Sequence, residues 1–149
     1  MKTLVIDASA LLAAWLPEEL YQAQADALLD RYQEGRLRLC APMLLADEIL
    51  NGLYLAVRGK GGRAPRLTPQ EASEVWRLFQ SLHISLEETS HLANRIFELA
   101  LTYHRPSTYD ATYIALAEHL RTKLITADER LMKSVPEKWV LPLWEFEAS

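Results

Sequence analysis

Short apolar segments without polar alternation recur along the chain, and helix-like segments separate them. Residues 3–6 are continuously apolar or β-branched and lead directly into Asp7. Such a run predicts a strand that is buried on both faces, as is typical of a parallel sheet. Residues 124–126 repeat the pattern two positions before Asp128. Strands that alternate with helices in this way predict an α/β fold, a three-layer sandwich around a central, mainly parallel sheet.

Helix signals lie between these predicted strands. Ser9 is expected to cap a helix over residues 10–16, which Pro17 ends. Thr68 to Glu71 form a capping box with proline at the first helical position, which predicts a helix start. The glycine-rich stretch over residues 58–66 is the one segment that resembles a long loop.

Size and composition narrow the class of protein. A length of 149 residues predicts a single domain over residues 1–149, and 50% hydrophobic residues exclude a disordered chain. A net charge of −4 argues against a uniformly basic protein that wraps a nucleic-acid duplex. One cysteine, Cys40, excludes a disulfide framework and a Cys-rich zinc site. No apolar run is long enough to span a membrane and no signal-peptide pattern opens the chain, so we expect no membrane association and a cytoplasmic location.

Four acids stand out by their positions. Asp7 and Asp128 follow predicted strands, and ligands of open α/β sheets bind beyond the carboxyl ends of the strands. Asp110 shares a helix stripe with the apolar residues Ile114 and Ala117, so its carboxylate is expected to face the core.

Glu48 also falls on an expected inward face of its helix, although neighbouring Asp47 remains an alternative. Each acid has a purely structural interpretation as well. Asp7 and Asp128 can cap helices, Asp110 can favour a helix N-terminus, and Glu48 can lie on a solvated face.

Taken together, the four acids predict one acidic pocket. Clustered carboxylates repel each other, and we expect no lysine or arginine beside Asp7 or Asp110 to neutralise them. A hard divalent cation, Mg²⁺ or Mn²⁺, would satisfy an all-oxygen site. Such an ion supports hydrolysis of phosphodiester bonds, which is the activity that we expect.

Four motifs, in order, resemble those of PIN-domain ribonucleases of the VapC type. They are VIDAS at residues 5–9, EILN at 48–51, YDATYIALA at 109–117 and LITAD at 124–128. The resemblance spans nearly the whole chain. It implies a PIN-like fold, Mg²⁺- or Mn²⁺-dependent cleavage of RNA, a role as the toxin of a type II toxin–antitoxin pair, an antitoxin partner and a homodimer.

The resemblance also implies roles for single residues. The catalytic and metal-binding acids would be Asp7, Glu48, Asp110 and Asp128, of which Asp7 and Asp110 would be direct metal ligands. The supporting polar residues would be Ser9, Asn51 and Thr126.

Residues 58–66 carry four positive charges, and the resemblance does not account for them. Two interpretations stay open: a solvated loop, which alone would account for these charges, or side chains that contact RNA phosphates beside the acidic site. They are Arg58, Lys60, Arg63 and Arg66.

Two other enzyme classes with acids at strand ends fit poorly. A haloacid-dehalogenase-like phosphatase needs a second acid where this chain has Ser9, and a receiver domain needs a lysine after a late strand, whereas Lys123 precedes one. The alternative that stays open is a non-catalytic PIN-like RNA-binding or scaffold module, in which the acids serve only as caps.

Overall fold

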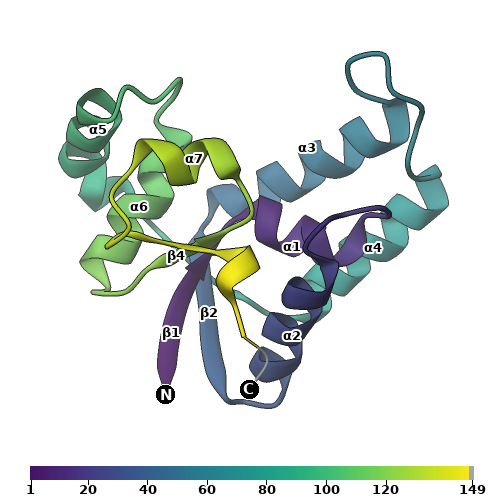
Figure 1. Ribbon diagram of the computed structural model, residues 1–149, viewed down its shortest axis with the longest axis horizontal. Coiled ribbons are helices and arrows are strands. Elements are labelled where there is room, and N and C mark those ends of the chain that lie inside the picture. The colour runs from purple at the N-terminus through teal and green to yellow at the C-terminus, as the bar shows by residue number, and fades with distance from the viewer. Residues whose placement is uncertain (148–149) are drawn as a thin grey trace.

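The centre of the molecule is a five-stranded sheet in which every strand pairing is parallel. The structure is a computed structural model that describes residues 1–147 (Figure 1). The strand order is β3-β2-β1-β4-β5. The strands are β1 (Lys2–Ile6), β2 (Leu37–Pro42), β3 (Ser85–Glu87), β4 (Leu124–Thr126) and β5 (Val140–Pro142).

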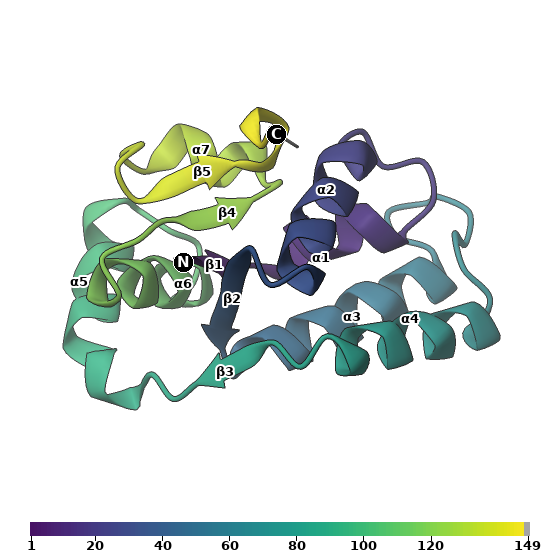
Figure 2. The same cartoon turned by 90° about the horizontal axis from the view of Figure 1, so that it is seen from below.

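Helices cover both faces of this sheet. The helices are α1 (Ala8–Trp15), α2 (Gln22–Gln33), α3 (Leu44–Arg58), α4 (Pro69–Ser81), α5 (Ala93–Thr102), α6 (Tyr109–His119) and α7 (Glu129–Ser134), with short 3-10 turns at Ser90–Leu92 and Leu143–Glu145. Helix α6 packs on one face with α5 outside it, whereas α1 and α2 lie on the other face (Figure 2). Helices α3 and α4 run side by side and are joined by the glycine-rich loop. The expected three-layer α/β architecture is therefore confirmed.

Strand β1 lies in the middle of the sheet and is buried on both faces, as its apolar run predicts. Leu4, Val5 and Ile6 are at most 1% exposed. Val5 pairs with Cys40 of β2 on one side and with Leu124 of β4 on the other. From β1 the chain builds outward to β2 and β3, and then returns to add β4 and β5 on the opposite side. The boundary between β1 and β4 is therefore the topological switch point, where open α/β sheets place their ligands.

Of two helix starts predicted from the sequence, the one at Thr68 is confirmed and the one at Ser9 is wrong. The capping box is present in full, because Thr68 Oγ1 accepts from the Glu71 backbone and the Glu71 side chain accepts from the Thr68 backbone. The prediction that Ser9 caps the first helix is wrong. Asp7 has the extended backbone of an N-cap, and its carboxylate accepts from the Ala10 backbone N–H. The helix begins directly after β1, so Ser9 already lies within its first turn.

No helix within residues 1–147 is long and apolar enough to cross a membrane.

Candidate acidic active site

Asp7 lies at the carboxyl end of β1, at the switch point of the sheet, and its side chain is held on three sides. Oδ1 accepts hydrogen bonds from Ser9 Oγ at 2.6 Å and from the Ala10 backbone at 3.0 Å. Oδ2 accepts from Thr126 Oγ1 of the neighbouring strand β4. Asp7 is only 9% exposed and Thr126 is fully buried. The pairing of β1 with β4 therefore brings two expected site residues, 119 positions apart in the chain, into direct contact.

The environment of Asp7 opposes its negative charge. Burial raises the pKa of Asp7 to about 6, and the nearby Glu48 charge raises it further, while the hydrogen bonds from Ser9, Thr126 and Ala10 lower it. Donors aimed at both carboxylate oxygens favour the ionised form, but they do not offset the loss of water. A cation next to Asp7 would remove this conflict.

Glu48 reaches the same region from the second turn of α3. Burial raises the pKa of Glu48, the Tyr113 hydroxyl lowers it, and the Asp110 charge raises it. The geometry of a hydrogen bond between Glu48 and Tyr113 is nevertheless not met. Within the described part of the chain, Glu48 Oε1 and Tyr113 Oη are both buried without a hydrogen-bond partner. Glu48 therefore presents an oxygen that lacks a donor.

Tyr113 is a residue of this site that sequence reasoning missed. It is 2% exposed and follows Asp110 by one helical turn on α6. Burial raises the pKa of Tyr113, and the charges of Glu48, Asp7 and Asp110 raise it further. The i, i+3 spacing from Asp110 was the available signal. A tyrosine in an apolar helix stripe is usually a core residue, so the spacing alone does not reveal the role.

Asp110 lies in the first turn of α6 and has a partner that was not expected. Arg105 donates to Asp110 Oδ2 from Nη2 at 2.8 Å and from Nε at 3.3 Å. The Arg105 side chain is 9% exposed and the Asp110 side chain 29%, so the arginine is shielded from water while the carboxylate is partly exposed. The expectation that no arginine neutralises Asp110 is therefore wrong. Arg105 lies outside the helix, in the turn that precedes α6, where helical periodicity gives no sign of the contact.

Asp128 is tied to the helix that follows it. Its Oδ1 accepts from the backbone N–H groups of Arg130 and Leu131, so it acts as the N-cap of α7. Its own backbone N–H donates to Thr126 Oγ1 at 3.1 Å, which places it next to the Asp7 network. Within residues 1–147, no group of three or more acidic, histidine or cysteine side chains lies close enough to hold one ion.

The remaining expected residues divide between buried and exposed positions. Asp47 is exposed, whereas Glu48 turns inward, so the structure favours Glu48 over its neighbour. Asn51 is exposed at the next turn of α3. Ser9 Oγ lies 3.2 Å from Thr126 Oγ1 and also accepts from the Ala127 backbone N–H, so it links the ends of β1 and β4.

The four cations of the glycine-rich loop also divide into two pairs. The Arg58 guanidinium lies over the Tyr54 ring at 5.4 Å, and Arg66 pairs with Glu19 at 3.0 Å. Lys60 and Arg63 are exposed, and neither forms an ion pair with any residue between 1 and 147. The structure therefore leaves two of the four expected RNA contacts unengaged.

The chemistry of the donors fits a hard divalent cation, although among residues 1–147 no three of them lie close enough to hold one ion. Asp7 and Glu48 offer buried carboxylate oxygens, and Glu48 Oε1 lacks a donor. These are the ligands that Mg²⁺ and Mn²⁺ prefer. Asp110 fits with one restriction, because Arg105 already occupies its Oδ2.

Comparisons with known proteins identify the family of the chain. The model of the PIN domain family matches residues 4–138. Ribonuclease VapC3 of Pyrobaculum aerophilum is 36% identical over 137 residues, which cover 89% of this chain and 95% of that protein. Ribonuclease VapC9 of Mycobacterium tuberculosis is 38% identical over 129 residues, which cover 86% of this chain and 87% of that protein.

Solved structures show the same fold. The crystal structure of PAE2754 from Pyrobaculum aerophilum has a TM-score of 0.66 at 23% identity and covers 97% of this chain and 92% of its own. The structure of VapBC2 from Rickettsia felis, bound to a DNA fragment from its promoter, has a TM-score of 0.63 at 10% identity and covers 94% of this chain and 98% of that one. The family match over almost the whole chain, together with the identity to curated relatives, shows that the chain belongs to the PIN-domain family, and within it to the VapC group.

Proposed function

We propose that this protein is a divalent-metal-dependent ribonuclease that hydrolyses RNA phosphodiester bonds at the pocket of Asp7, Glu48 and Asp110. One observation carries the proposal. Asp7 is a buried carboxylate at the switch point of the sheet, its pKa is raised to about 6, and Glu48, the acid that acts on it, has an unpartnered oxygen. Such carboxylates are costly to bury unless a cation compensates them. The ribonuclease names of the curated relatives support RNA as the substrate.

The residues of the chain would divide the work in the pocket. Asp7 and Glu48 would hold Mg²⁺ or Mn²⁺, with Asp110 contributing through the oxygen that Arg105 leaves free. When bound, the ion supplies Lewis-acid stabilisation of negative charge at the phosphoryl group. Ser9 and Thr126 orient the Asp7 carboxylate by donating to its two oxygens. Asp128 has a supporting role in this proposal, because its Oδ1 already caps α7.

The alternative is a non-catalytic RNA-binding or scaffold module. Three contacts support this alternative. Asp7 and Asp128 both act as N-caps, and Asp110 is neutralised by Arg105. In such a module the acids would stabilise the fold without binding metal. Replacing them would then leave the function of the protein unchanged.

The test is cleavage of a mixed set of RNAs with Mn²⁺ or Mg²⁺, with and without EDTA. Native protein is compared with Asp7→Asn and Asp110→Asn, each freed of any co-purified partner by unfolding and refolding. We expect metal-dependent cutting that either substitution reduces by at least about 10²-fold, since a lost metal ligand costs several kcal/mol of transition-state stabilisation. Asp47→Asn is the matched control, because this exposed neighbour of Glu48 should leave cutting unchanged.

Two other outcomes would contradict the proposal. Cutting that survives both substitutions would place the activity elsewhere or in a contaminant. RNA binding without cutting, by every preparation, would support the non-catalytic module.

The predicted partners belong to the same proposal. A role as the toxin of a toxin–antitoxin pair predicts an antitoxin that blocks the acidic pocket. The structure of VapBC2, a protein with the same fold, supports the expectation of a partner. A homodimer is the expected oligomeric state. Light scattering of the purified chain, alone and after co-expression with a candidate antitoxin, tests both expectations.

A further inference from the structure

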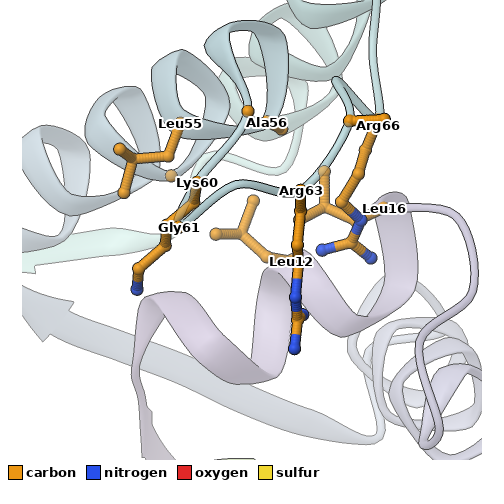
Figure 3. A pocket seen from close by; sticks show the side chains of 11 residues that line it. Leu12, Leu16, Leu55, Ala56, Lys60, Gly61, Arg63 and Arg66 are labelled. Atoms are coloured by element: carbon orange, nitrogen blue, oxygen red, sulfur yellow. The ribbon is translucent and has the colours of Figure 1, made fainter.

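A cavity of about 470 Å³ opens between α1 and α3, beneath the glycine-rich loop. Its floor is apolar and its rim is positively charged (Figure 3). The floor includes Leu12, Leu16 and Leu55, and the rim is formed by Lys60, Arg63 and Arg66, whose side chains extend from the loop toward α1. A cavity of this size matches ordinary small-ligand sites.

The loop is anchored over this cavity by one of its own cations. The Arg66 guanidinium donates to the Pro17 carbonyl and forms an ion pair with Glu19 at 3.0 Å. The Arg66 backbone N–H donates to the Ala56 carbonyl at 2.7 Å. Arg66 is therefore structural, and it leaves Lys60 and Arg63 as the unpaired charges at the rim.

The loop backbone also depends on one glycine. Gly59 has a φ of +87°, and a Cβ at this position would lie 2.4 Å from the Arg63 carbonyl oxygen. Only glycine fits this close approach, which folds the loop back toward α1. The two unpaired cations are thereby presented above the leucine floor.

The cavity adjoins the acidic pocket along two helices. Helix α1 starts at Asp7 and carries Leu12, and helix α3 carries Glu48 and then Gly52 and Leu55. Gly52 is four residues beyond Glu48, or about 6 Å along the helix axis, and Leu55 is about 10 Å beyond it. A Cβ on Gly52 would lie 2.5 Å from Leu12 Cδ1, so this glycine lets α1 and α3 approach closely at the edge of the cavity.

We propose that this cavity is a subsite for one unpaired nucleotide that flanks the scissile bond of the RNA. The base would lie on the leucine floor, and Lys60 and Arg63 would contact the adjoining phosphate. This inference rests on the proposed function, because it needs the scissile phosphodiester at Asp7 and Glu48. An RNA strand held there must continue with further phosphates, which carry the charge opposite to that of Lys60 and Arg63. The cavity that these two cations line reaches Gly52, about one helical turn beyond Glu48.

An acidic peptide with apolar side chains is the competing occupant, since it also combines a negative charge with an apolar group. The observations favour the nucleotide. Helix α1, which Asp7 caps, and helix α3, which carries Glu48, both line the cavity, and the proposed substrate at these two acids is a phosphodiester. The acidic chain, with a net charge of −4, also needs a local positive region to hold an anionic strand.

The first test measures binding of labelled single-stranded oligoribonucleotides by fluorescence anisotropy, without metal, to the Asp7→Asn variant. We expect the added pair Lys60→Gln and Arg63→Gln to weaken binding about tenfold. It should also reduce the slope of log K against log salt by about 1.4, the value for two contacts to a single strand. The control removes the same charge at the amino end of β2, with Arg36→Gln and Arg38→Gln, and should leave the slope unchanged.

A change of opposite sign sharpens this test. Glu18 and Arg63 line an adjoining cavity, and Glu18 is exposed. Removing this negative charge by Glu18→Gln should strengthen RNA binding, because Glu18 repels the same phosphate that Arg63 attracts. Weaker binding by this variant would contradict the proposal.

The second test concerns the leucine floor. Oligoribonucleotides that carry one abasic residue are compared with the intact strand at each position. We expect one position, next to the cleavage site, where loss of the base weakens binding at least fivefold. The Leu55→Ser variant should bind the intact and the abasic strand equally. If Leu55→Ser does not fold, the comparison of intact and abasic strands on wild-type protein decides this point by itself.

The outcomes separate this inference from the proposed function. If the Lys60 and Arg63 variants bind long RNA like the control, the subsite is wrong, even where Asp7→Asn and Asp110→Asn still abolish cutting. If no abasic position matters and an acidic peptide displaces RNA, the cavity binds a protein segment, and the inference is overturned. Failure of the proposed function itself appears in a different measurement, the absence of metal-dependent cutting by native protein.

Discussion

The acidic pocket and the cationic loop differ in how their charges are held. Asp7 is buried, accepts three hydrogen bonds and lies where two strands meet. Lys60 and Arg63 are exposed on a loop that a single arginine anchors. Burial controls whether the acids of the pocket are ionised, whereas the exposed cations of the loop stay charged and are screened by water and salt. Changes in the pocket should therefore alter stability and metal binding, and changes in the loop should alter RNA affinity and its salt dependence.

The largest expected effect is the pH dependence of the metal-free protein. The folded pKa of Asp7 is about 6 against an ordinary value of 3.8, so the folded state binds the proton more tightly than the unfolded state. Stability from this group is fully present below about pH 4 and is lost as pH rises through about 6. The difference amounts to about 3 kcal/mol.

Chemical denaturation of the metal-free protein between pH 4 and 7 measures this effect. Asp7→Asn should reduce the decline over that range, since position 7 then has no carboxyl proton to lose, and the raised pKa of Glu48 leaves a smaller decline of the same sign. Added Mn²⁺ should restore stability at the upper end, because it binds the ionised carboxylate. A native protein whose stability rises steadily from pH 4 to 6 would contradict the burial of Asp7.

The next effect comes from Arg105, the cation inside the acidic region. Arg105→Gln should lower the metal-free stability by about 2 kcal/mol, because it leaves Asp110 without its charged donor. The same variant should bind Mn²⁺ more tightly, since Asp110 Oδ2 becomes free and a repelling charge is removed. Calorimetric titration with Mn²⁺ and thermal unfolding measure the two changes.

Arg95→Gln is the matched control for this prediction. Arg95 of α5 also pairs with an acid of α6, through two contacts with Glu118 at 2.6 and 2.7 Å, but it is more exposed than Arg105. Its loss should cost less than about 1 kcal/mol and leave Mn²⁺ affinity unchanged. Equal effects of the two variants on metal affinity would rule out a specific role for Arg105.

A smaller effect is expected from Tyr113. Its hydroxyl is buried without a hydrogen-bond partner within the described chain, so Tyr113→Phe should change stability by at most about 1 kcal/mol. The hydroxyl lowers the pKa of Glu48, so its removal should raise that pKa and weaken Mn²⁺ binding most at acidic pH. Mn²⁺ titrations at pH 5 and pH 8 test this, and a loss that is equal at both values would contradict the assigned cause.

The smallest stability effect should come from the loop anchor. Arg66 and Glu19 are each about one-third exposed, so Arg66→Gln should cost about 0.5 kcal/mol or less. Proteolysis within residues 59–65 should nevertheless become faster, because the loop loses its attachment to Pro17 and Glu19. Unchanged cleavage would mean that the backbone contacts from Arg66 and Leu67 to Ala56 suffice to hold the loop.

The sequence predicted the elements that depend on local chemistry. The apolar run before Asp7 gave a central buried strand, and the Thr68 capping box gave a helix start at Pro69. Glu48 turns inward and Asp7 contacts Thr126, and each of these three residues belongs to one of the four sequence motifs. The cap at Ser9 was wrong because Asp7 and Ser9, two positions apart, can both start a helix, and only the backbone angles decide between them.

By itself, then, the sequence determined the fold class and the acids at the strand ends, because burial and capping depend on neighbours a few residues away. Only the tertiary structure decided which charges meet. Arg105 reaches Asp110 from a turn, Tyr113 faces Glu48 from another helix, and Arg66 ties the loop to Glu19. These contacts depend on how helices and turns pack in three dimensions. No periodicity along the chain encodes such packing, because it is set by the shapes of many side chains at once.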